Sequence, residues 1–231
     1  MRLACVKLPV ILALMQPAFA GGAPRAVPAT RPIAGVAASA SANNAATAPL
    51  TENLAKGSVE DVKAAREAMK AFIDGLIRGD DKRVMDQLSI TDTDRGVAEA
   101  MFGLICATQR LRQAALEAHI DLSGVDLGAT EDDGKRLEVA VVASVPTIQG
   151  DTAKMVLNDD TYELKRVGGA WKLDFAATQK HMGDMPPAAV VQQSKKKMAA
   201  YDALSADVKN GKVKTTQEIK DTLAAIEKEG K

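Results

Sequence analysis

Residues 150–175, "GDTAKMVLNDDTYELKRVGGAWKLDF", constrain the fold most, because polar and apolar residues alternate there between two tight turns. Successive side chains of a strand point to opposite faces, so alternate residues from 153 to 157 would share one face. The turn at Gly168-Gly169 suits a two-residue hairpin, because glycine supplies the positive φ that such a turn needs. The stretch therefore predicts three antiparallel strands.

Residues 136–145, "RLEVAVVASV", also alternate and predict one more strand before this stretch, with Pro146 in the turn that follows. The prediction is a four-stranded antiparallel meander. The residues expected to face inward in its last two strands are Tyr162, Leu164, Trp171, Leu173 and Phe175, and those expected outward are Glu163, Lys165, Lys172 and Asp174.

Before residue 137 the apolar spacing is helical. Ser58 is the expected N-cap of a first helix, Asp61 could reach back to it in a variant capping box, and Gly79 ends the helix. A short helix over "DKRVMDQL" and a long one over roughly 95–120 follow. The predicted cap of the long helix is Thr93 or Asp94, and "DLSGVDLGATEDDG" is a predicted loop.

Two further helices are predicted after the meander. Pro186-Pro187 can start the first, since proline fits the first helical position, and Gly211 ends it. Thr215 and Glu218 form a capping box for the second. This helical tail would pack on the sheet or on the other helices, or would serve as a partner-binding arm. Helices followed by a meander and then by helices indicate an α+β fold.

The first twenty residues, "MRLACVKLPVILALMQPAFA", have the pattern of a secretory signal peptide cleaved before Gly21. The apolar core is too short for a membrane anchor, which needs roughly 20 apolar residues. We therefore expect a periplasmic or extracellular protein. Residues 21–57 are an expected disordered Ala/Pro-rich linker, with or without a tethering role.

Charge and cysteine content narrow the function classes. Cleavage would leave 28 basic against 30 acidic residues, and such a balance argues against a nucleic-acid or anionic-membrane surface. No later stretch is apolar enough for stable membrane insertion. One cysteine, Cys106, would remain, so no intramolecular disulfide is expected.

Two stretches, "AAREAMKAFIDGLIRGDDKRVMDQL" and residues 150–175, resemble bacterial exported proteins with a nuclear-transport-factor-2-like domain. The shared features are a helix ending in Gly79-Asp80, the strand "GDTA" and the hairpin "GG-WK-D". The resemblance covers roughly 59–178 and implies a bent sheet wrapped around helices, often with a pocket at its open end. The predicted domains are then 58–180, nuclear-transport-factor-2-like, and 181–231, a C-terminal helical extension.

No residue can be assigned to catalysis, and the sequence predicts no cofactor and no metal site. His119 suits a helix C-terminus, where a cation is favourable, better than catalysis. His181, near Asp184, is expected in a solvated connector. Cys106 is expected to be a small buried residue rather than a nucleophile.

Certain aromatic and basic residues could either bind a ligand or partner, or serve only the structure. Trp171 and Tyr162 could stack on a ligand but are more typical of a core. The run Ser194–Lys197, "SKKK", could bind an acidic partner but is more typical of a solvated helix face.

The leading hypothesis is an exported, non-catalytic binding domain for a small apolar ligand or an envelope protein, held in the mouth of the sheet. A homodimer through the outer face of the sheet is expected with it. The first alternative is a cofactor-independent isomerase or dehydratase that uses a pocket carboxylate. The second is an envelope scaffold that uses the linker and the helical tail.

Overall fold

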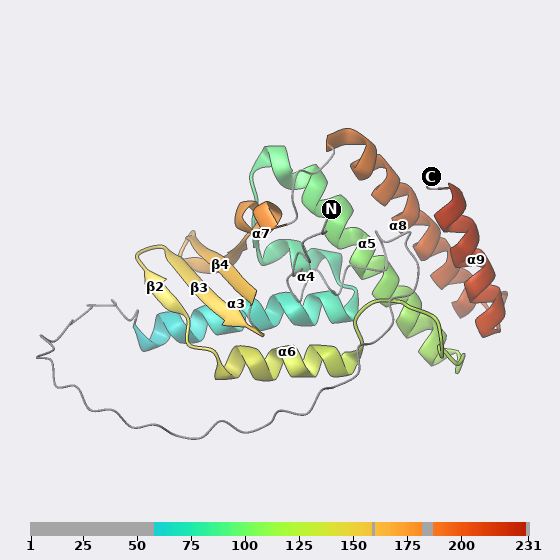
Figure 1. The fold of residues 1–231 in the computed structure, drawn as a ribbon, viewed down its shortest axis with the longest axis horizontal. Helices are drawn as coiled ribbons and strands as arrows, with labels where there is room; N and C mark the ends of the chain where they lie inside the picture. The colour runs from blue at the N-terminus through green and yellow to red at the C-terminus, as the bar shows by residue number, and fades with distance from the viewer. Residues whose placement is uncertain (1–57, 159, 182–186, 230–231) are drawn as a thin grey trace, which may run out of the picture.

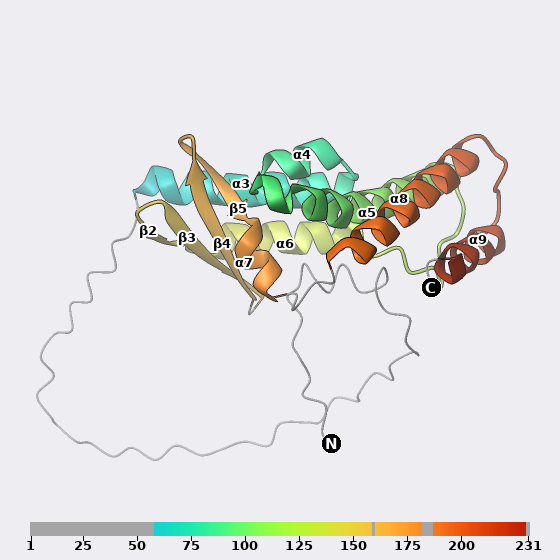
Figure 2. The same ribbon diagram turned by 90° about the horizontal axis from the view of Figure 1, so that it is seen from above.

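A computed structural model describes residues 58–229 apart from 159 and 182–186. The expected signal peptide, the linker and Asp184 lie outside these residues. The described chain is α+β, with helices on an antiparallel meander and further helices after it, as predicted. The sheet lies at one end of an elongated molecule and the last two helices lie at the other (Figures 1 and 2).

The sheet contains the predicted hairpins of residues 150–175. Its strands are β2 (Thr147–Gln149), β3 (Thr152–Leu157), β4 (Asp160–Val167) and β5 (Ala170–Asp174), paired antiparallel in chain order. Gly168 and Gly169 both have positive φ, at 59° and 84°, in the β4–β5 turn. A two-residue strand that the sequence did not predict, β1 (Leu88–Ser89), adds to β5 in parallel.

Three helices precede the meander. They are α3 (Val59–Arg78), α4 (Asp81–Asp86) and α5 (Asp92–Glu117). Ser58 caps α3, accepting the amide of Asp61 at 3.1 Å, and Gly79 ends it with φ 66°. The Asp61 carboxylate does not complete a capping box, because it accepts a hydrogen bond from Arg166 of β4 instead. The buried side chains of α3, among them Met69, Phe72 and Ile73, pack with those of β3, β4 and β5 in one core.

The N-cap of α5 is Thr91, and not Thr93 or Asp94 as predicted. The Thr91 hydroxyl accepts the amide of Asp94 at 3.3 Å and donates to the Asp94 carboxylate at 2.6 Å. Asp94 therefore lies inside the first turn, where an acid stabilises the helix dipole.

The predicted strand over 136–145 is wrong, because residues 136–143 belong to helix α6 (Glu131–Ala143). Thr130 and Asp133 form a capping box that starts the helix, and three acids occupy its first turn. The buried residues are Gly134, Leu137 and Val141, at helical spacing. In Figure 1 α6 runs beside α3, and the first strand of the meander is the shorter β2.

The end of β5 also differs from the prediction. Asp174, expected to point outward, is 5% exposed and pairs with Lys165 at 2.6 Å. Its carboxylate also accepts the amide of Ala176 at 3.1 Å, at the start of helix α7 (Phe175–His181). His181 is therefore the last residue of a helix rather than part of a connector.

The C-terminal helices are α8 (Pro187–Lys209) and α9 (Thr216–Glu229). Glu218 and Thr215 exchange the two hydrogen bonds of the predicted capping box, at 3.0 and 3.2 Å. The predicted packing of the tail on other helices is confirmed, since α8 lies along α5 (Figure 2). Residues of both helices form a second core, which includes Leu104, Leu111, Tyr201, Leu204 and Val208.

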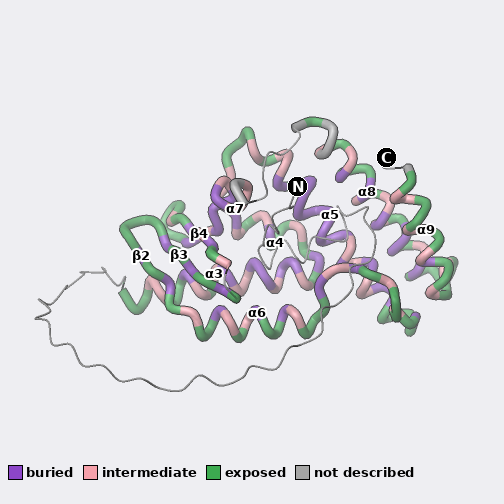
Figure 3. Tube along the Cα trace, in the orientation of Figure 1, coloured by how far each residue is buried: buried purple, intermediate pink, exposed green. Residues whose placement is uncertain are grey.

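Burial follows this division into two cores. Figure 3 shows buried residues along α5 and α3 and on alternate positions of the strands, whereas exposed and intermediate residues predominate on α6 and α9. Both cores contain side chains of α5, so this one helix packs against the sheet and against the C-terminal helices.

Candidate functional site

The inner face of the sheet, where a ligand was expected, is filled by the protein's own side chains. Met155, Leu157 and Leu164 are at most 1% exposed. Trp171 and Tyr162 are core residues, 4% and 5% exposed. The Arg166 guanidinium covers the Trp171 ring at 4.7 Å from its centroid. These packed side chains leave the aromatic faces no room for a ligand.

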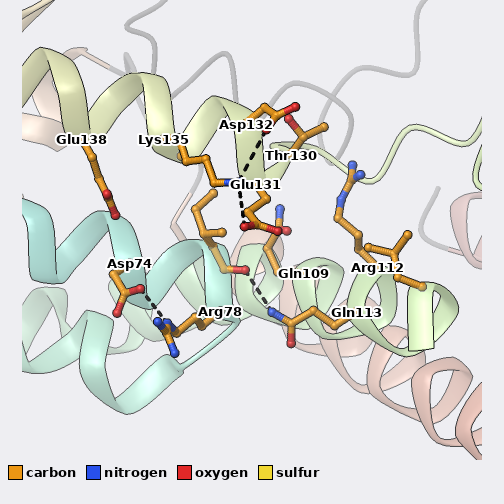
Figure 4. Close-up of a pocket in the computed structure, with 13 residues that line it drawn as sticks. Asp74, Arg78, Gln109, Arg112, Gln113, Thr130, Glu131, Asp132, Lys135 and Glu138 are labelled. Carbon is orange, nitrogen blue, oxygen red and sulfur yellow. Dashed lines mark hydrogen bonds and ion pairs between the residues drawn. The ribbon is translucent and has the colours of Figure 1, made fainter.

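A groove of about 570 Å³ lies elsewhere, between α3, α5 and α6. This volume falls in the range of small-molecule sites, roughly 300–1,000 Å³. Figure 4 shows side chains of all three helices around it. Most of its lining residues are polar or charged, although polar and apolar atoms contribute equally to its surface. The lining consists of Asp74, Ile77, Arg78, Gln109, Arg112, Gln113, Leu116, Thr130, Glu131, Asp132, Gly134, Lys135 and Glu138.

The wall of the groove forms where α6 approaches α3 closely. A Cβ on Gly134 would lie 2.8 Å from Cγ1 of Ile77, so only glycine allows this approach without a shift of Ile77. α5 contributes Gln109, Arg112 and Gln113, which share one helix face at spacings i, i+3 and i+4.

The loop between α5 and α6 closes the groove at one end. The Gln109 side-chain amide donates to the carbonyl of Ala129 at 3.0 Å, and Arg112 donates to the carbonyl of Gly128 at 2.9 Å. These bonds hold the loop against α5 and place the capped start of α6 beside Arg112.

Most charges in the groove are neutralised by neighbours. Asp74 pairs with Arg78 at 2.6 Å and with Arg83 at 2.9 Å, and Lys135 pairs with Glu131 at 3.0 Å. All three pairs involve solvent-exposed groups, so screening by water keeps their contribution to stability small.

Arg112 differs, because no described carboxylate lies within ion-pair distance of it. It is partly buried, and its Nε is enclosed without any hydrogen-bond acceptor. Burial lowers the pKa of this guanidinium, while Asp126 and Asp133 raise it only from a distance. An enclosed donor without an acceptor costs free energy. The described residues accept only one hydrogen bond from Arg112, so an anionic group that reached the remaining Nη hydrogens would be stabilised.

Glu138 is the acidic counterpart on α6. It lies two turns beyond Glu131 and forms no ion pair with any residue that the structure describes. Figure 4 places it at the end of the groove opposite Arg112, with its carboxylate toward α3. The groove thus has a cation without a close ion-pair partner at one end, with Asp126 and Asp133 at longer range. At the other end it has a carboxylate that interacts with Arg78 and Lys135 only at longer range.

The histidines and the cysteine considered from the sequence lie away from the groove lining. His119 is exposed and follows the C-cap of α5 with φ 55°, and His181 ends α7. Cys106 is fully buried, as predicted, and burial raises its thiol pKa, so the unreactive interpretation fits.

The basic run on α8 is partly exposed to solvent and partly buried against α9. Lys195 and Lys196 are exposed, whereas Ser194 and Lys197 are buried. The Lys197 ammonium lies 2.8 Å from the Glu227 carboxylate of α9, so it joins the two C-terminal helices.

The described part of the chain contains neither a metal-binding cluster nor a candidate membrane span. Residues 58–229, outside the two gaps, contain no cluster of three or more His, Cys, Asp or Glu side chains arranged to hold a metal ion. None of the helices described there is both long and apolar enough to cross a bilayer.

Comparisons with known proteins give no assignment. No protein-family model matches the chain, and no significant match was found among curated proteins or among solved structures. The resemblance to nuclear-transport-factor-2-like domains, and the division at residue 180 that depends on it, therefore stay predictions.

Sequence reasoning missed the groove because its residues come from three helices. One signal was available: the polar positions Gln109, Arg112 and Gln113 share one face of a helix that is otherwise largely buried. The loop that encloses Arg112 left no such signal in the spacing of residues.

Proposed function

We propose that this protein is an exported, non-catalytic binding protein whose ligand occupies the groove between α3, α5 and α6. The observation that carries the proposal is Arg112, a partly buried and unpaired cation in a groove of about 570 Å³. The filled inner face of the sheet supports a scaffold role for the strands. The ligand would be polar rather than the apolar one that the sequence suggested.

The isomerase or dehydratase alternative has less support. It requires a carboxyl group with a raised pKa, held in a dry pocket as a general acid or base. Among the described carboxyl groups whose pKa shifts, Asp121, Asp133 and Glu218, every pKa is lowered, because each carboxylate accepts hydrogen bonds.

Backbone amide NMR on the full chain tests the site. Titration with a library of short peptides and amphoteric metabolites should give saturable shifts at Gly134, Lys135 and Gln113. Leu116 lines the groove and is 57% exposed, so Leu116→Trp should block binding without loss of fold. Val167→Trp, at a 45% exposed position of β4, is the matched control. Saturable shifts confined to the strands would contradict the proposal.

Export and self-association are parts of the proposal with their own tests. Mass spectrometry of protein made in a bacterial host should find Gly21 as the first residue, and an intact Met1 would contradict export. The outer face of the sheet carries the Lys154–Glu163 pair at 3.1 Å, which could meet a second copy of itself. Light scattering that shows only monomer at high concentration would exclude the homodimer.

A further inference from the structure

We infer that the groove recognises the free carboxylate of a short peptide whose C-terminal residue is apolar and which carries a basic group about two residues upstream. This inference rests on the proposed function and specifies its ligand. It depends on three features of the groove: the unpaired Arg112, the exposed Leu116 beside it, and the unpaired Glu138 at the far end.

The carboxylate is assigned to Arg112 by its hydrogen-bonding capacity. A guanidinium has five donors in a planar fork that fits a carboxylate through two parallel bonds. In this protein Nη2 donates to Gly128 and Nε is enclosed, so Nη1 and the second hydrogen of Nη2 are the donors left for a carboxylate. The other three cations near the groove, Arg78, Arg83 and Lys135, already pair with carboxylates.

Leu116 specifies the neighbouring side chain of the ligand. It follows Arg112 by one helical turn on α5, so the two residues share a face. Leu116 lines the groove and is 57% exposed. An apolar side chain next to the carboxylate would bury against it.

The length of the ligand follows from α6. Glu131 lies nearer to Arg112 than Glu138 does (Figure 4), and seven residues, or about 10 Å along a helix, separate Glu131 from Glu138. An extended peptide rises about 3.3 Å per residue, so about three residues span the distance. A basic group there would meet the Glu138 carboxylate, with Asp74 of α3 beside it (Figure 4).

Calorimetry on the full chain with Lys-Ala-Leu tests the inference. Replacement of its carboxylate by an amide should weaken binding about 10- to 100-fold, the usual loss for a charged hydrogen-bonded pair. Arg112→Gln should cause the same loss, and Arg112→Lys should recover only part of it, because lysine lacks the fork. Arg95→Gln, at an exposed position of the same helix, is the control.

Glu138→Gln should abolish the preference for Lys-Ala-Leu over Glu-Ala-Leu. A carrier domain ending in the same three residues distinguishes the two sources of the carboxylate: binding of the carrier indicates a protein C-terminus, and binding of the free tripeptide alone indicates a small peptide. Equal affinity for the acid and the amide, or for wild type and Arg112→Gln, would overturn the inference. If NMR still showed saturable shifts at the groove, the proposed function would stand. Absence of groove shifts with every probe would overturn both.

Discussion

Gly79 combines a backbone requirement with a packing requirement in one residue. Its φ of 66° is left-handed, and a Cβ there would lie 2.7 Å from the Cys106 carbonyl oxygen. Gly150 has a similar φ of 58°, but a Cβ there would meet no atom within 4 Å, so Gly150 shares only the first requirement. Substitution of Gly150 would therefore introduce conformational strain alone, whereas substitution of Gly79 would add steric overlap to it.

We expect Gly150→Ala to lower the free energy of unfolding by about 1–2 kcal/mol, the usual cost of a left-handed residue. Gly79→Ala should cost about 1–3 kcal/mol more, because α3 and α5 must separate to admit the methyl group. Urea denaturation of both variants measures the difference. Equal losses would show that the contact with Cys106 does not constrain the helices.

Tyr201 is a residue whose burial has a consequence at high pH. Burial raises the pKa of its phenol to about 12, with smaller contributions from Glu227 and Asp126. The folded pKa lies above the unfolded one, so the unfolded chain loses its proton first as pH rises. Stability from the neutral phenol is therefore complete below about pH 10 and is lost between about pH 10 and 12.

Between about pH 10 and 12 the wild type should therefore lose about 2–3 kcal/mol of its free energy of unfolding. Tyr201→Phe, which has no phenol hydroxyl, should not show this loss. Chemical denaturation at several pH values above about 9 measures both, and the difference between the proteins removes the contribution of the lysines, which titrate in the same range. Phenolate absorbance gives the pKa directly. A parallel decline of the two proteins would contradict the burial of this hydroxyl.

At the scale of elements, α6 shows where sequence periodicity fails. One face of a hypothetical strand over 136–145 would be apolar and the other mixed, and Leu137 and Val141 also fit the spacing of a helix. The pattern therefore does not distinguish a strand from a helix. A strand would place Val139 and Val141 on the same face, whereas in α6 Val141 is fully buried and Val139 is 69% exposed.

The two valines thus provide a direct test of the element. We expect Val141→Ala to lower the free energy of unfolding by about 1.5–3 kcal/mol, the value of a fully buried valine. Val139→Ala should change it by less than about 0.5 kcal/mol, as is usual for a surface position. Thermal or urea denaturation is sufficient, and equal losses would favour the strand.

The elements that were predicted correctly carry local signals. Ser58, Gly79, the Thr215–Glu218 box and the Gly168-Gly169 turn each fix a boundary through bonds or dihedral angles within a few residues. Longer-range partners decided the rest. Asp61 pairs with Arg166 instead of completing the capping box, and Asp174 is buried and pairs with Lys165. These partners are distant or on another strand, so the spacing of residues along the chain does not reveal them.

The same limit applies to the candidate site. The burial of Cys106 was predicted from the sequence and is confirmed. The groove was not predicted, because Arg112 becomes an unpaired, enclosed cation only when the loop carrying Gly128 folds back on α5. A site made by one loop and three helices has no fixed spacing along the chain.

At the scale of the whole molecule, α5 connects two cores through opposite sides of one helix. Met101, Phe102, Ile105 and Cys106 belong to the core under the sheet, and Leu104, Ala107 and Leu111 to the core with α8. Arg110 adds a polar connection: it pairs with Asp81 beside α3 and with Asp202 of α8, both at 2.9 Å. We therefore expect the described helices and sheet to unfold together.

Leu204→Ala tests this cooperativity from the end of the molecule opposite the sheet. Leu204 is 3% exposed, so its truncation should cost about 2–5 kcal/mol. The chain has one tryptophan, Trp171, which lies in the core under the sheet, so its fluorescence reports on that core alone. If the cores are coupled, Leu204→Ala shifts the fluorescence transition by the same free energy as the circular dichroism transition. Lys196→Ala, on the exposed face of α8, should shift neither. A variant in which helical signal is lost before Trp171 responds would show that α8 and α9 fold as a separate unit, and the boundary predicted near residue 180 would then be a real division of the chain.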